Sequence, residues 1–169
     1  MNLLSFLSTV NSLLGGSGHV RASMIVSSEK TTEKIVFPVV PNPLPTVSVP
    51  QANEVFNAID GDKNLVGDMG LRSVSFEALL PGRDVSFAAR NSSSTSDILD
   101  FLDVHRRNKD VMRLAIVLDN GDDYINMPCL IGDMSYVRNK MGDYRVSLTF
   151  TEYVYVIKST DAQTAGGSV

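Results

Sequence analysis

The stretch Gly142-Asp-Tyr-Arg-Val-Ser-Leu-Thr-Phe-Thr-Glu-Tyr153 decides the fold. Its apolar side carries Tyr144, Val146, Leu148 and Phe150. A period of two is typical of a strand that is buried on one face, and we expect this strand to continue to Val156. Glu152 falls in the apolar register. Since a buried carboxylate needs donors around it, we expect either an arginine or several N–H groups beside Glu152, or a bulge near Thr151 that turns it outward.

Shorter segments upstream show the same alternation or a β-rich composition. Further strands are expected at 20–26, 34–37, 47–49, 73–80, 114–118 and 125–131. Asn120-Gly121 is a strong hairpin signal because both residues tolerate positive φ. Five prolines fall within 38–50, so this stretch is an edge or extended segment, because proline donates no N–H. The pattern predicts a mainly β fold of six or seven strands.

One internal helix is expected after the serine-rich loop 91–96. Ser96 suits the N-cap, and Asp97 suits the first turn at the positive end of the helix dipole. One face carries Ile98, Phe101, Leu102 and His105. The basic run 105–109 suits the helix C-terminus, with a phosphate contact as the alternative interpretation.

The first 18 residues contain no charged side chain and show the pattern of a short amphipathic helix. Its apolar stripe consists of Leu3, Leu4, Leu7, Val10, Leu13 and Leu14. The glycines of 15–18 would end the helix and form a joint. An isolated helix of this length is marginal in water, so the stripe must dock either on the chain's own domain or on another subunit. We hypothesise that another subunit binds this stripe, through Leu3, Leu4, Leu7, Val10 and Leu14.

The segment 51–70 has no clear period and is expected to be a loop or a weak helix. Asp60-Gly61-Asp62-Lys63-Asn64 looks like the start of a calcium-binding loop, in which oxygen ligands alternate. Leu65 fills the glycine slot of that motif and Leu71 fills the glutamate slot, so a polar turn is the better interpretation.

Composition excludes several function classes for this chain of 169 residues. A net charge of −4 disfavours direct recognition of nucleic acid. One cysteine and two histidines cannot build the usual zinc sites, and no nucleotide-binding or hydrolase motif occurs. No segment is apolar enough to span a membrane. We therefore expect no catalytic residue, cofactor or metal, and no enzyme.

Five motifs occur in a recognisable order. They are Phe37-Pro38-Val39-Val40-Pro41, Gly70 to Pro81, Met112 to Val117, Asn126-Met127-Pro128 and Gly142 to Tyr153. This order resembles the N-terminal domain of the LysM-containing tail proteins of contractile-tailed phages, defective prophages and tailocins. The resemblance covers roughly 33–156, and no LysM module follows in the sequence. The residues that carry the family motifs, expected to be structural, are Phe37, Pro38, Gly70, Arg72, Phe76, Pro81, Arg113, Gly142, Asp143, Glu152 and Tyr153.

The resemblance implies a structural virion protein at the baseplate hub or tube junction, assembled in the bacterial host cytoplasm. The implied fold is an antiparallel β-sandwich or barrel with a flanking helix, similar to the tail-tube module. The chain would divide into the helix and joint at 1–18, a tail-tube-like β domain at 19–158 and a flexible tail at 159–169. The implied partners are sibling copies in a cyclic homo-oligomer such as a hexamer, and tube, hub or wedge proteins. The alternatives are a tail-tube or tail-terminator subunit and, from another class, a ligand-binding β-sandwich.

Overall fold

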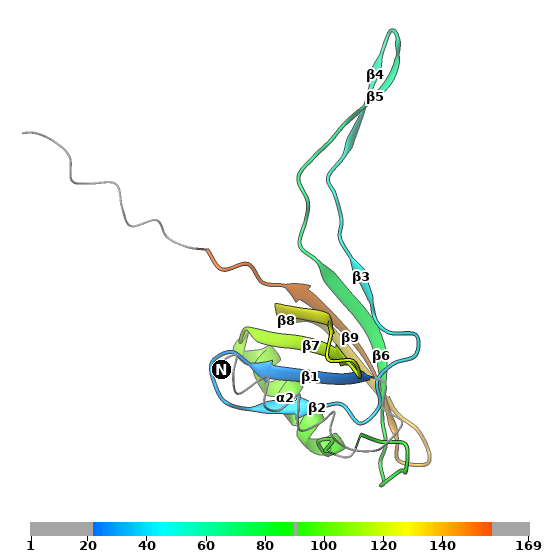
Figure 1. The fold of residues 1–169 in the computed structure, drawn as a ribbon, viewed down its shortest axis with the longest axis vertical. Coiled ribbons are helices and arrows are strands. Elements are labelled where there is room, and N and C mark those ends of the chain that lie inside the picture. The colour runs from blue at the N-terminus through cyan, green and yellow to red at the C-terminus, as the bar shows by residue number, and fades with distance from the viewer. Residues whose placement is uncertain (1–21, 90, 157–169) are drawn as a thin grey trace, which may run out of the picture.

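The computed structural model describes residues 22–89 and 91–156, and within them one helix and nine strands. The elements in chain order are β1 (Ala22–Ser28), β2 (Lys34–Val36), β3 (Thr46–Ser48), β4 (Glu54–Ala58), β5 (Gly61–Leu65), β6 (Ser73–Leu80), α2 (Thr95–Asn108), β7 (Met112–Leu118), β8 (Asp123–Arg138) and β9 (Tyr144–Glu152). Figure 1 shows a compact body from which the β4–β5 hairpin projects. The expected N-terminal helix at 1–18 and tail at 159–169 lie outside the described residues.

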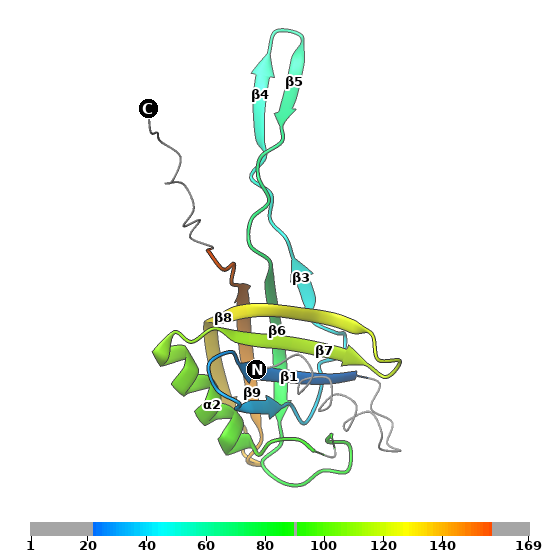
Figure 2. The same cartoon turned by 60° about the vertical axis from the view of Figure 1, so that its left-hand side comes forward.

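Seven strands form one antiparallel sheet in the order β2-β1-β7-β8-β9-β6-β3. The long strand β8 belongs to two layers, because its first half pairs with β7 and its second half pairs with β9. The strand changes partner at Cys129, which lies opposite both Met112 of β7 and Glu152 of β9, and its register with β9 shifts just beyond, between Ile131 and Met134. A bulge of this kind bends a strand. The sheet therefore folds over itself like a sandwich, with β1 and β7 crossing in front of β6 and β9 (Figure 2).

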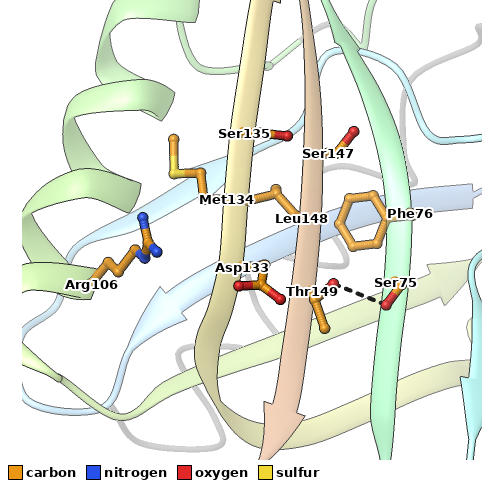
Figure 3. Close-up of a pocket in the computed structure, with 9 residues that line it drawn as sticks. All are labelled: Ser75, Phe76, Arg106, Asp133, Met134, Ser135, Ser147, Leu148 and Thr149. Carbon is orange, nitrogen blue, oxygen red and sulfur yellow. Dashed lines mark hydrogen bonds between the residues drawn. The ribbon is translucent and has the colours of Figure 1, made fainter.

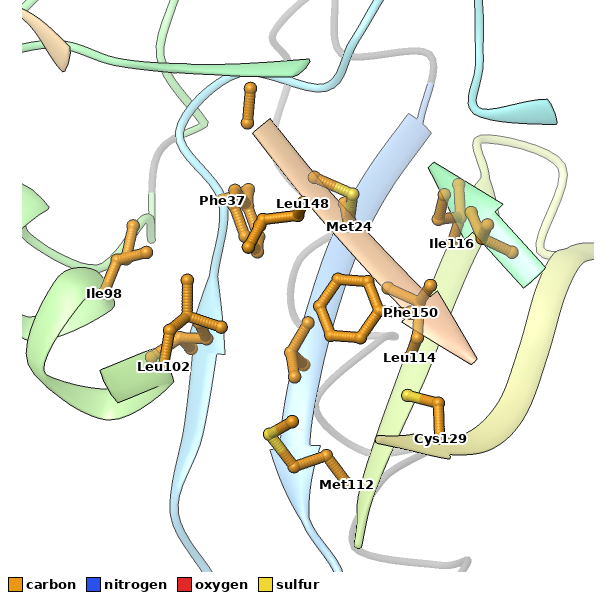
Figure 4. Close-up of a cluster of buried hydrophobic side chains, with 14 of the residues drawn as sticks. Met24, Phe37, Ile98, Leu102, Met112, Leu114, Ile116, Cys129, Leu148 and Phe150 are labelled. Carbon is orange, nitrogen blue, oxygen red and sulfur yellow. The ribbon is translucent and has the colours of Figure 1, made fainter. Parts of the chain in front are cut away.

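The main core lies between the two layers and under the helix. Its largest fully buried side chains include Met24, Phe37, Ile98, Leu102, Met112, Leu114, Ile116, Leu148 and Phe150 (Figure 4). The stretch 144–150 supplies Val146, Leu148 and Phe150 to this core, as its alternation predicts. The fold class expected from the sequence, mainly antiparallel β with one flanking helix, is confirmed.

Helix α2 begins two residues earlier than the sequence suggests. Its N-cap is Ser94, whose hydroxyl accepts a hydrogen bond from the Asp97 N–H at 3.2 Å, rather than Ser96. Lys109 ends the helix in the left-handed conformation, and its N–H bonds back to the carbonyl of Arg106. Ile98, Leu102 and His105 are buried, as expected, while Arg106, Arg107 and Lys109 are exposed.

Two segments differ from expectation. The segment 51–70 is neither loop nor helix but contains the β4–β5 hairpin, with Asp60 in its tip turn. Strand β9 ends at Glu152 instead of continuing to Val156. The hairpin turn at 119–123 forms as predicted, with Gly121 at φ 86°.

Candidate assembly surfaces

A hairpin formed by residues 50–71, which we call the arm, stands away from the body (Figures 1 and 2). At its tip β4 pairs with β5 from Glu54↔Leu65 to Ala58↔Gly61. Below the tip, the Ala52 N–H donates to the Asp68 carbonyl at 3.1 Å, and Gln51 bridges Met69. The arm is thus a two-stranded ribbon along most of its length.

Glycine is required where the two legs of the arm approach most closely. A Cβ added to Gly67 would lie 1.6 Å from the Ala52 carbonyl oxygen, which is well inside a hard contact. At the tip, Gly61 has φ +114°, a conformation that glycine adopts at little cost. These two glycines let the backbone fold into a narrow hairpin.

The arm exposes apolar side chains that a lone hairpin cannot bury. Its exposed apolar residues are Val55, Phe56, Ile59, Leu65, Val66, Met69 and Leu71. Phe56 lies opposite Lys63, and Leu65 lies opposite Glu54, so Phe56 and Leu65 are diagonal neighbours on one face. A two-stranded hairpin is at best marginally stable alone in water. The arm is therefore suited to dock on another surface.

A charged pair fixes the root of the arm to the sheet. The Arg72 N–H donates to Glu152 Oε2 at 3.0 Å, and its Nη2 donates to Oε1 at 2.7 Å. The Glu152 N–H in turn donates to the Arg72 carbonyl at 2.8 Å. These hydrogen bonds from Arg72 lower the pKa of Glu152 below its ordinary value. The arginine that the alternation predicted beside Glu152 is Arg72, and the bulge is not needed.

The other leg of the arm is held by β3 and its neighbours. β3 pairs with β6, and the Tyr124 hydroxyl donates to the Pro45 carbonyl at 3.1 Å. The Gly70 N–H donates to the Pro50 carbonyl at 2.7 Å, which joins the two legs. Both legs therefore enter the sheet in fixed positions.

The remaining motif residues lie in three places. At the opposite end of β6 and β9, Asp143 Oδ1 accepts from the Gly82 N–H at 3.0 Å, next to Gly142 at φ 94° and Pro81. In the core, the Phe76 ring contacts Phe37 edge-on and stacks on Phe150, while Pro38 is buried. The other two lie near the outer side of β7, where Arg113 donates to Glu29 at 2.7 Å and Tyr153 contacts Tyr155.

The second half of β8 offers an unpaired strand edge. Residues 134–138 pair with β9 on one side, whereas the β7 pairing of β8 ends at Cys129. Tyr136 and Val137 are 57% and 71% exposed. An exposed edge with apolar side chains is a template for pairing with another chain.

A depression of about 540 Å³ lies beside this edge (Figure 3). Arg106 from α2 and Asp133 from β8 stand at its rim, and the hydroxyls of Ser75 and Thr149 bond each other at 3.0 Å. These two hydroxyls satisfy each other, and Arg106, Asp133, Ser135 and Ser147 supply the other polar side chains of the lining.

Cys129 and His105 are both buried, the first in the core and the second in a cluster of charged side chains. Cys129 is buried in the core, and desolvation raises the pKa of its thiol to about 12. His105 lies between Asp110 Oδ2 at 3.0 Å and Glu33 Oε2 at 3.4 Å, and Asp110 also pairs with Lys30. Hydrogen bonds from Lys30 and then His105 lower the pKa of Asp110. Residues 22–89 and 91–156 contain no cluster that could hold a metal and no helix able to cross a bilayer.

The interface residues proposed from the sequence, Leu3 to Leu14, lie outside the described residues. The sequence does not predict the arm as an interface. The signal for the arm was present in Asp60-Gly61, a dipeptide typical of hairpin turns. It was hidden because both faces of β4 and β5 mix apolar with polar residues, so no period of two emerges.

No protein-family model matches the chain, and no curated protein matches it. Among solved structures, the chain is similar to one from the virion of a native gene transfer agent particle, with 12% sequence identity and a TM-score of 0.48. The match covers 78% of this chain and 92% of that chain. At this level of similarity no family is established.

Proposed function

We propose that this protein is a non-enzymatic structural subunit of a phage-like tail, which forms a ring at the junction of the tail tube with the baseplate hub. The arm is the observation that carries the proposal. It combines exposed apolar residues such as Phe56 and Leu65 with a root fixed by Arg72 and Glu152. A rigidly rooted apolar projection gains stability only when a neighbouring protein covers it.

The edge of β8 supports the same proposal. Strand addition along residues 134–138 would join one copy to the next through main-chain hydrogen bonds. A repeated head-to-tail contact closes into a ring when its rotation permits. In this arrangement the edge and the arm both contact the neighbouring copy, so that ring formation needs both, and the arm also faces a tube, hub or wedge protein.

Removal of the arm tests the proposal. Ala52 and Asp68 are an antiparallel pair joined by a hydrogen bond, so a two-residue Asn-Gly turn can replace residues 53–67 between them. We expect this variant to keep the melting temperature of the body but to sediment as a monomer and to form no rings in electron micrographs. The matched control, Asn64→Ser, changes a polar arm residue and should assemble normally.

The outcome also separates the two virion roles. Single rings support the junction, whereas long stacked tubes support the alternative of a tail-tube subunit. If the intact chain remains monomeric at high concentration and with tail partners added, or if the armless variant assembles as well as the intact chain, the proposal is wrong.

A further inference from the structure

Strands β1 and β7 are buried on both faces, although a strand at the surface of a two-layer fold normally has one solvated face. Met24 and Leu114 point into the main core. The opposite face carries a second buried group, which we call the outer cluster. It consists of Ile25, Val36, Ala115 and Val117, with exposed fractions of 1%, 6%, 0% and 1%.

All four members of the outer cluster come from β1, β2 and β7. No other helix or strand of the described residues contributes a buried apolar side chain to this cluster, and the loop segment 91–93 bonds the backbone of β2 at its edge, through Val36 and Ser93. Helix α2 and strand β9 contribute their buried residues, such as Leu102 and Leu148, to the main core on the other side. The outer cluster therefore needs a cover that comes from outside 22–89 and 91–156.

We propose that the outer cluster is the docking site for the apolar stripe of residues 3–14 of the same polypeptide. These residues precede β1, which begins at Ala22 and forms the centre of the face to be covered. The intervening residues 15–21 include three glycines and can span roughly 23 Å when extended. That reach lets the chain turn back across its own first strand.

The dimensions of the two partners agree. A helix over residues 3–14 would be about 18 Å long and about 10 Å wide. Strand β1 has seven residues, which corresponds to about 23 Å, and the three strands β2, β1 and β7 are together about 14 Å wide. One such helix fills this face, and no room is left for a second.

The charge pattern agrees as well. Besides its apolar members, the face carries Ser23 and Ser27, which are small and buried. The charged pair Arg113 and Glu29 lies at the end of β1 farthest from Ala22. A helix buried on the centre of the face must lack charged side chains, because an unpaired buried charge is costly, and residues 1–18 contain none.

This docking goes beyond the proposed function and replaces the hypothesis that the stripe binds another subunit. Deletion of residues 1–16 gives the first test. We expect the methyl resonances of Ile25, Val36 and Val117 to shift, while those of Val146 and Leu148 in the main core stay in place. The melting temperature should fall by the same amount at every protein concentration, because the lost contact lies within one polypeptide. Unchanged outer-cluster methyls would overturn the proposal.

A cross-link in the full chain covers the case in which the truncated variant does not fold. In a Cys129→Ala background, Leu7→Cys or Val10→Cys is combined with Val117→Cys and oxidised. We expect a disulfide within one polypeptide.

The matched control combines Ser12→Cys with Val117→Cys and should not cross-link, because Ser12 lies opposite the stripe at helical spacing. No cross-link from either stripe position, or a disulfide that joins tagged to untagged copies, would show that the stripe does not dock in this way. Because the assay needs no assembly, it gives the same result whether or not the arm forms rings.

Discussion

The carboxylate of Glu152 accepts hydrogen bonds from both the backbone N–H and the guanidinium of Arg72, although the two residues are 80 positions apart in the sequence. Each carboxylate oxygen accepts one hydrogen bond from Arg72, and the backbone of Glu152 returns a third. The pair stands where the arm enters β6 and where β9 ends. It therefore fixes the direction in which the arm leaves the sheet.

Replacement of Glu152 by Gln should weaken this root. We expect the free energy of unfolding to fall by about 1 kcal/mol at pH 7, a modest value because Arg72 is 43% exposed and solvent screens the pair. The folded state lowers the pKa of Glu152, so its contribution is present above the unfolded pKa and is lost as pH falls through the folded pKa. Urea unfolding should therefore show a gap between wild type and Glu152→Gln that closes below about pH 4. A gap that is independent of pH would contradict the ionic character of the pair.

Replacement of Gly67 by Ala should open the arm without harming the body. The new methyl group would collide with the Ala52 carbonyl, which is backbone and cannot turn aside. Amide hydrogen exchange should become faster in 51–69 and remain unchanged in β6 and β9. Gly132→Ala is the control, since its nearest neighbour would lie at an ordinary 3.4 Å. Equal exchange in the two variants would show that the legs of the arm are not packed as described.

Replacement of Val137 by Lys should block association along β8. Lysine on an exposed edge strand disfavours pairing with another chain. The side chain is 71% exposed, so the stability of the monomer should change by less than about 0.5 kcal/mol. Val104→Lys is the matched control, because Val104 is 51% exposed but lies on α2. Sedimentation should show weaker association for Val137→Lys alone, and equal losses in both variants would argue against the edge.

The thiol of Cys129 should be inert in the folded protein. Burial raises its pKa to about 12, so at pH 8 the folded chain holds almost no thiolate. Reaction with a disulfide reagent should be slower by roughly three orders of magnitude than in urea. A rate in buffer that matches the rate in urea would mean that the β7–β8 layer opens readily.

Much of the fold was predictable because it depends on local alternation. The stretch 144–150, the hairpin at 119–123 and the apolar face of the helix follow from periods of two or 3.6 residues. The double role of β8 was not predictable, since no local signal shows that one strand changes partner at Cys129. The choice of Ser94 over Ser96 as N-cap was equally hidden, because both serines suit the position.

The candidate surfaces were less predictable than the core. The need for a partner beside Glu152 followed from its register, but the identity of Arg72 depends on a contact between distant segments. The sequence does not predict the arm, because neither of its faces is buried in the monomer. Its strands therefore show no alternation of apolar and polar residues. Conversely, the sequence predicts an apolar stripe over residues 3–14, and these residues lie outside the described part of the chain.

The shared strand β8 gives the molecule a mechanical property. Strands β3 and β6 both run into the arm, so tension applied to the arm pulls along both strands and loads the ladder between β6 and β9 in shear (Figure 1). Because β9 and β7 both pair with β8, the two layers share that load and are not pulled apart. The seven-stranded sheet can therefore hold the arm in place when a force acts on the arm.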